Sequence, residues 1–158
     1  MTREELERLY QAGKRDFAGV NLESTFLREI NLEGADLHGA NLKGSTLTMA
    51  NLRGANLSGA DFGPTSLNGI ELRANLRDAQ AEGANLEGAN MEGMNLVRVN
   101  LRRANLSGAN LHAVHLLGAD LSGADLEGTT VTKEQLAEAA SLEGAVLPGG
   151  NGSGPSAS

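Results

Sequence analysis

The sequence predicts an all-β solenoid, and three features of one five-residue repeat support this fold class. A leucine recurs at every fifth position over most of the chain, so that 19 of the 24 repeat centres from Phe17 to Val131 are Leu. Asn or Asp stands directly before the centre in 17 units, and Gly stands two residues after it in 14. Ala stands two residues before the centre in 13 units. A constant short period of this kind is typical of repeat architectures.

The five-residue period fits neither a helix nor a continuous strand. On an α-helix each five-residue step rotates by about 140°, so the leucines would spread around the whole cylinder. On a strand an odd period sends successive leucines to opposite faces, and Asn, Asp and Gly are poor strand formers. The remaining solution is a chain that turns once per repeat, with Ala and Leu pointing inward and Asn and Gly forming the turn.

The pattern Ala-(Asp/Asn)-Leu-Xaa-Xaa over residues 15–131 resembles the repeat of the pentapeptide repeat proteins. The resemblance implies a right-handed quadrilateral parallel β-helix, in which four repeats make one coil. At four repeats per coil the chain would form about six coils, stacked at roughly the 4.8 Å spacing of neighbouring strands. Residues 4–22 and 132–148 also resemble end segments of bacterial members of the family, including cyanobacterial ones.

Short capping helices are expected at both ends of the solenoid. Residues 2–13 predict a helix with a capping box of Thr2 and Glu5 and a glycine stop at Gly13. Residues 132–135 repeat the capping-box pattern, and the chain is then expected to return against the last coil through Leu142, Val146 and Leu147. The predicted organisation is an N-terminal capping helix (1–14), a β-helix (15–131), a C-terminal capping helix with a return segment (132–148) and a disordered tail (149–158).

The repeat breaks its register once, between Leu72 and Leu76, where one unit is a residue short. We expect a one-residue deletion absorbed by a tight corner, with no long inserted loop; the alternative is a bend that divides the rod into halves. Ala81 follows as a small residue at a repeat centre. Nearby side chains must fill its space, because a Leu-to-Ala truncation in a core costs about 2 to 5 kcal/mol.

Composition excludes several classes of function. The chain has no Cys and three His, which argues against thiolate, redox and metal chemistry, and His112 and His115 are not expected to form a metal site. A net charge of −7 argues against binding to nucleic acid or to an acidic membrane surface. Without a predicted membrane span or secretory signal, we expect a cytoplasmic protein. We also expect it to be a monomer or weak dimer. A filled rod with flat sides also predicts no enzyme and no cofactor.

The outward positions carry the remaining signal. Residues 16–131 contain 14 acidic and eight basic residues, which we expect to be mixed rather than segregated by side. Arg98, Arg102 and Arg103 are predicted to form a basic cluster next to Glu87 and Glu92. The leading hypothesis is a structural or interaction module that docks an unknown partner protein through these five residues by charge complementarity.

The family resemblance supplies a second functional hypothesis. Some pentapeptide repeat proteins resemble duplex DNA in size and charge and protect type II topoisomerases from inhibitors. Two features argue against this role here: arginines interrupt the acidic residues, and the short rod is not expected to carry an inserted loop or a terminal dimerisation helix.

Overall fold

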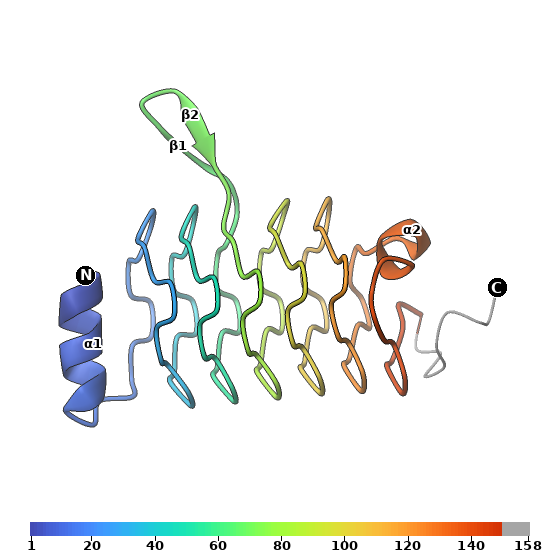
Figure 1. Ribbon diagram of the computed structural model, residues 1–158, viewed down its shortest axis with the longest axis horizontal. Helices are drawn as coiled ribbons and strands as arrows, with labels where there is room; N and C mark the ends of the chain where they lie inside the picture. Colours follow the sequence, from blue (N-terminus) through green and yellow to red (C-terminus); the bar gives the residue numbers. More distant parts are fainter. Residues whose placement is uncertain (150–158) are drawn as a thin grey trace.

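In the computed structural model, which describes residues 1–149, the chain winds into a rod of stacked coils (Figure 1). Each coil has four short sides joined by turns. Parallel β-bridges connect residues of adjacent coils, and the bridged residues are 20 apart through most of the rod, as in Asn21 with Asn41 and Asn31 with Asn51. The period of five residues per side, four sides per coil, therefore follows directly from the backbone pairing.

The bridges divide the surface into four sides, which we number 1 to 4 in chain order. The bridged columns are Asp16, Asp36, Asn56, Asn85, Asn105, Asp125 and Val146 on side 1; Asn21, Asn41, Asp61, Asn90 and Asn110 on side 2; Phe26, Thr46, Asn75, Asn95 and His115 on side 3; and Asn31, Asn51, Gln80, Asn100, Asp120 and Ser141 on side 4.

Residues 55–59 illustrate how the sequence produces one side and one turn. Ala55 and Leu57 are buried in the interior of the coil. The Oδ1 atom of Asn56 accepts a hydrogen bond from the backbone N–H of Ser58 (3.2 Å), which bends the chain as in an Asx turn. Gly59 has φ +62°, a left-handed conformation that glycine adopts without a steric penalty. Asn before the centre and Gly after it are thus both turn residues.

The register break is an insertion, and the expectation of a one-residue deletion without an inserted loop is wrong. Thr46 pairs with Asn75, a spacing of 29 residues instead of 20. The extra chain forms an antiparallel hairpin of β1 (Thr65–Leu67) and β2 (Ile70–Leu72), which stands away from the rod (Figure 1). Leu67 is exposed and Leu72 half-buried, so neither is a centre of the solenoid interior.

At the N-terminal end of the rod, helix α1 (Arg3–Gln11) lies across the first coil (Figure 1). Leu6 is fully buried, and the Tyr10 hydroxyl donates a hydrogen bond to the carbonyl oxygen of Glu33 (2.8 Å). One half of the predicted capping box is present, since the Thr2 hydroxyl accepts a hydrogen bond from the N–H of Glu5 (3.2 Å). Gly13 has a positive φ just after the helix.

Near the other end, helix α2 spans only Lys133–Leu136 and begins with the predicted capping box of Thr132 and Gln135. The helix is a single turn, and the chain leaves it after Leu136. Residues 141–146 then rejoin the solenoid through bridges from Ser141 and Val146. Of the predicted disordered tail (149–158), only Gly149 lies within the described residues.

The interior is apolar, and the coil that contains Ala81 also contains an unusually large side chain. Ala81 is fully buried on side 4. On the opposite side of the same coil lies Phe62, the largest fully buried side chain. The large ring and the small methyl group share one level of the interior, as close packing requires. Within residues 1–149 no helix is long and apolar enough to cross a bilayer.

Candidate interaction surfaces

The interior of the described chain is almost entirely apolar. Ser45 is the one buried polar residue among the described positions, and its hydroxyl donates to the carbonyl oxygen of Leu42 (2.7 Å). No buried side-chain nitrogen or oxygen in residues 1–149 is without a hydrogen-bond partner. The described chain also contains no group of three or more His, Asp or Glu side chains arranged to hold a metal ion.

Acidic and basic residues are mixed on sides 2, 3 and 4, as expected, but side 1 departs from this expectation. Side 1 carries five acidic residues and no Lys or Arg over residues 16–131, namely Asp16, Asp36, Glu87, Asp125 and Glu127. Side 3 is different. Its two acidic residues, Glu29 and Asp78, are outnumbered by three bases, Arg28, Arg77 and Arg98. One side of the rod is therefore acidic, and the opposite side is close to neutral.

Side 3 is also where large apolar side chains reach solvent. Phe26 is 76% exposed, Leu117 61% and Met49 48%, and all three project from this side or from its turns. On an ordinary solenoid side these outward positions would carry small or polar residues. A neutral side with several exposed apolar groups is the composition expected of a protein-binding surface.

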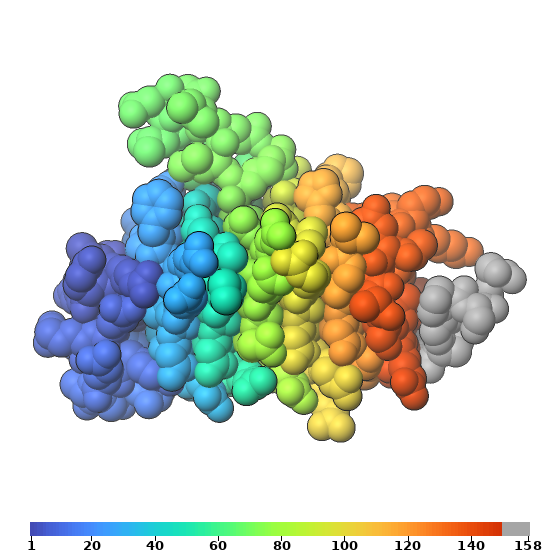
Figure 2. Space-filling view, viewed as in Figure 1, coloured from blue at the N-terminus to red at the C-terminus, as the bar shows by residue number. Residues whose placement is uncertain are grey.

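The hairpin adds two further exposed apolar side chains beside side 3. It leaves the rod at the edge between sides 2 and 3, after Phe62, and its strands pair Leu67 with Ile70 next to the turn. Asn68 and Gly69 both have positive φ, as a two-residue hairpin turn requires. Leu67 and Ile70 are 55% and 66% exposed at the tip. In the space-filling view the hairpin forms a lobe over the coils nearest the N-terminus (Figure 2).

Contacts at its base hold the hairpin against side 2. The Thr65 hydroxyl donates a hydrogen bond to the Glu23 carboxylate (2.5 Å), two coils away along the rod. Thr65 and Leu72 pack so closely over Gly44 that a Cβ atom there would lie 2.7 Å from Thr65 Cγ2 and 2.9 Å from Leu72 Cβ. The hairpin thus leans toward the N-terminal coils and requires a glycine beneath it.

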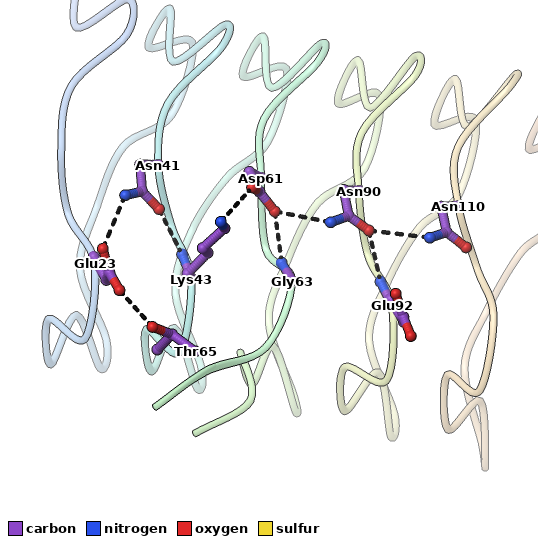
Figure 3. A network of polar contacts seen from close by, with 9 residues as sticks. All are labelled: Glu23, Asn41, Lys43, Asp61, Gly63, Thr65, Asn90, Glu92 and Asn110. Atoms are coloured by element: carbon purple, nitrogen blue, oxygen red, sulfur yellow. Dashed lines mark hydrogen bonds and ion pairs between the residues drawn. The ribbon is translucent and has the colours of Figure 1, made fainter. Parts of the chain in front are cut away.

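A chain of side-chain hydrogen bonds runs along side 2 to the foot of the hairpin (Figure 3). The amide of Asn110 donates to Asn90 Oδ1 (3.1 Å), and the amide of Asn90 donates to Asp61 Oδ1 (2.9 Å). Asp61 also accepts the N–H of Gly63 (2.9 Å), where the chain enters the hairpin, and pairs with Lys43 Nζ (3.2 Å). These bonds connect the regular amide column to the insertion.

The carboxylates in this network are held in their ionised form. Burial raises the pKa of Asp61, but hydrogen bonds from Gly63, Lys43 and Asn90 outweigh it, and the pKa lies below its usual value. The pKa of Glu23 is also lowered, first by the hydrogen bond from Thr65 and then by that from Asn41. Two anionic acceptors therefore secure the base of the hairpin.

The five charged residues singled out from the sequence surround one coil instead of forming one patch. Glu87, Glu92 and Arg98 lie on the turns of sides 1, 2 and 3, and Arg102 and Arg103 share the turn of side 4. Two of the arginines form ion pairs of their own. Arg98 makes a two-pronged contact with Asp78 (2.7 and 2.8 Å) and lowers the pKa of that carboxyl, and Arg102 pairs with Asp120 (3.2 Å).

A shallow groove lies on the edge between sides 2 and 3 near the C-terminal end of the rod. Its walls are the turn at His112–His115 and helix α2 with the residues that follow it, including Glu138. Gln135 fixes α2 here, because its amide nitrogen donates to the carbonyl oxygens of Leu111 (3.0 Å) and Val114 (3.1 Å). The groove occupies the same edge as the hairpin, which leaves the rod closer to the N-terminal end.

A comparison with models of protein families identifies the family to which this repeat belongs. The model for pentapeptide repeats matches eight copies, which together span residues 16–132. The chain belongs to the pentapeptide repeat family. Members of this family fold as right-handed quadrilateral β-helices, and they are generally non-catalytic structural or interaction modules. A comparison with curated protein sequences gives no significant match.

Solved structures of other pentapeptide repeat proteins resemble this chain. A protein from the Arabidopsis thaliana thylakoid lumen is 30% identical, with a TM-score of 0.65 over 73% of this chain and 74% of its own. HetL, involved in heterocyst differentiation regulation in the cyanobacterium Nostoc, is 26% identical, with a TM-score of 0.40 over 96% and 99% of the two chains. QnrB1, a plasmid-mediated fluoroquinolone resistance protein, is 24% identical, with a TM-score of 0.39 over 73% and 68%.

The hairpin and its exposed tip were absent from the sequence-based site, although a signal was present. Asn68-Gly69 between Leu67 and Ile70 is the dipeptide most typical of a two-residue hairpin turn. Leu67 and Leu72 also continue the five-residue period, so the repeat pattern concealed the insertion. The dipeptide and the period conflict here, and the dipeptide is the correct indicator.

Proposed function

We propose that this pentapeptide repeat protein is a non-enzymatic interaction module that binds protein through side 3 and the hairpin tip. One observation carries the proposal. Among the described residues, the large exposed apolar side chains other than Met1 all lie on these two neighbouring surfaces, namely Phe26, Met49, Leu67, Ile70 and Leu117. An apolar surface of this kind gains free energy when a partner covers it.

A filled interior and flat sides favour binding over catalysis. A catalytic site needs polar groups that converge in a concave and partly dry pocket. The groove beside His112 and His115 is shallow and open, and no buried side chain within the described range presents an unpaired polar atom to it. We therefore assign the protein no reaction.

The test is affinity capture from a lysate of the source organism with the tagged protein as bait. We expect Leu67→Ser with Ile70→Ser to lose the captured protein, because the change removes the apolar tip and leaves the base of the hairpin intact. Ser58→Thr, an outward position on side 1, is the matched control and should retain it. Equal capture by the native protein and the hairpin variant would overturn this assignment of the binding surface.

The ring of charged residues supplies an alternative docking surface. Within residues 1–149 Arg103 makes no ion pair, and its side chain lies over Gly123, whose added Cβ would be 3.4 Å from Arg103 Cγ. Arg103→Glu therefore reports on partner binding without breaking an internal pair, unlike changes at Arg98 or Arg102. Loss of capture in Arg103→Glu alone would move the interface to sides 4 and 1, where Glu87 lies.

Modulation of a type II topoisomerase is the second candidate, and the acidic side 1 is the observation that favours it. A row of carboxylates without interspersed bases is a crude likeness of a phosphate backbone. The experiment is a gyrase supercoiling assay with and without a quinolone. This candidate requires the purified protein to inhibit the enzyme or to protect it from the drug, and a protein without either effect would eliminate it.

A further inference from the structure

The exposed apolar side chains of side 3 are arranged along the rod in a way that suits a second copy of the same chain. Phe26 and Met49 are exposed on the two coils nearest the N-terminus. Leu117 is exposed toward the C-terminal end, one coil before the position of Glu138, whose carbonyl oxygen pairs with the N–H of Gly118 (2.9 Å). Reversing the direction of a second rod would place Leu117 of one copy opposite Met49 of the other.

The edge between sides 2 and 3 has a matching order. The hairpin leaves this edge near the middle of the rod and leans toward the N-terminal coils, because Thr65 contacts Glu23 and packs over Gly44. The groove between His112 and α2 occupies the same edge at the C-terminal end. In the reversed arrangement the protruding tip of one copy meets the groove of the other.

Charge allows this approach. Side 3 carries as many bases as acids once Glu138 is counted, so two such sides do not repel each other as two copies of the acidic side 1 would. Arg28 near the N-terminal end would face Glu138 of the second copy near its C-terminal end. Because a twofold axis relates the two copies, each of these contacts occurs twice in the dimer.

We infer that the protein forms an antiparallel homodimer through side 3, with the tip of each hairpin in the groove beside α2 of the other copy. This inference rests on the proposed function, since it names the partner for the same surface. The dimer accounts for both unusual features of the exterior, the apolar hairpin tip and the groove beside α2. The tip leans toward the N-terminal end of the edge between sides 2 and 3, and the groove lies at its C-terminal end.

The first experiment is sedimentation equilibrium of the full chain over a range of concentrations. We expect a dimer whose dissociation constant rises at least tenfold in Leu117→Arg and in Leu67→Ser with Ile70→Ser. Ser58→Arg introduces the same cation on side 1 and should leave the dimer unchanged. Circular dichroism and melting temperature establish that each variant is folded.

Orientation is tested with cysteines, since the native chain has none. In an equal mixture of Met49→Cys and Leu117→Cys, we expect the mixed disulfide to form faster than either homodisulfide. Preferential Met49→Cys homodisulfides would overturn the antiparallel arrangement.

A native protein that stays monomeric would overturn the dimer. If the hairpin variant still loses a captured protein in that case, the proposed function stands without the dimer. If the native protein is monomeric and the hairpin variant captures the same protein as the native chain, both the dimer and the proposed binding surface are overturned.

Discussion

At the scale of single residues, the asparagines before the repeat centres form columns with a direction. Within a column of the described residues, each amide-to-amide or amide-to-carboxylate bond donates toward the N-terminus, as from Asn85 to Asn56 (3.3 Å) and from Asn56 to Asp36 (3.0 Å). The column on side 2 likewise passes from Asn90 to Asp61 (2.9 Å). On sides 1 and 2 the chain of amides ends on a carboxylate, whereas on side 4 Asn100 donates to the amide oxygen of Gln80 (3.1 Å).

Asn90→Asp tests this direction with almost no change in shape. The substitution removes the donor to Asp61 and places two carboxylates in contact, so we expect the free energy of unfolding at pH 7 to fall by about 1 to 3 kcal/mol. Asn21→Asp, at the start of the same column and beside the N-terminal amine, is the control and should change little. Chemical denaturation measures both, and equal effects would contradict a specific role for the bond to Asp61.

The same carboxylates make stability depend on pH in one direction. The pKa of Asp78 is lowered first by its hydrogen bond from Arg98, and the pKa of Asp61 is lowered despite burial. A carboxyl whose folded pKa lies below its unfolded value stabilises the fold above the unfolded pKa, about 4, and loses that contribution as the pH falls through the folded pKa. We therefore expect unfolding free energy to decline below pH about 4, and to decline less steeply in Asp61→Asn. A steeper decline in that variant would refute the assignment.

At the scale of elements, the hairpin depends on the rod beneath it. An isolated two-stranded hairpin is marginally stable in water, so the contacts of Thr65 and Leu72 with side 2 must hold it in place. Gly44 is the critical neighbour, because a Cβ atom there would clash with both residues. Strands β1 and β2 therefore depend on tertiary contacts as well as on the turn propensity of Asn68-Gly69.

Gly44→Ala and Gly59→Ala form a matched pair that isolates this contact. Both glycines have nearly the same φ, +61° and +62°, but an added Cβ at Gly59 meets nothing within 4 Å. Each substitution should cost about 1 to 2 kcal/mol for the left-handed backbone. Gly44→Ala should cost about 1 to 3 kcal/mol more from overpacking, and hydrogen exchange at residues 65–72 should accelerate only there. Identical costs and unchanged exchange would show that the hairpin is held elsewhere.

The repeats with an unbroken five-residue period can be predicted from the sequence. The hairpin cannot be found from this period, because its leucines continue it. Centres such as Leu57 and Leu106 are buried as predicted. Leu67 and Leu72 continue the period although they belong to the hairpin, so counting by period alone places every later unit two sides away from its true position. That error concealed the acidic side, because Glu87 joins Asp36 on side 1 only in the true register. The exposed apolar surface of side 3 was missed for the same reason.

At the scale of the whole molecule, the rod behaves as a one-dimensional stack whose interior must be filled level by level. Each coil contacts its neighbours through backbone bridges, so a local change in volume cannot be relieved by moving a distant element. The coil that contains the insertion departs from the consensus twice, with Phe62 on side 2 and Ala81 on side 4. If these departures compensate, neither residue should be improved by restoring leucine alone.

The double-mutant cycle of Phe62→Leu and Ala81→Leu tests that compensation. Ala81→Leu restores the family consensus, yet we expect it to destabilise the protein by about 1 to 3 kcal/mol because the Phe62 ring already fills the level. Phe62→Leu should also destabilise, since it opens a cavity beside Ala81. The double variant should recover most of both losses, giving a favourable coupling of at least about 1 kcal/mol in urea denaturation. Additive losses would mean that the two side chains do not share one space, and that side 2 and side 4 of this coil are filled independently.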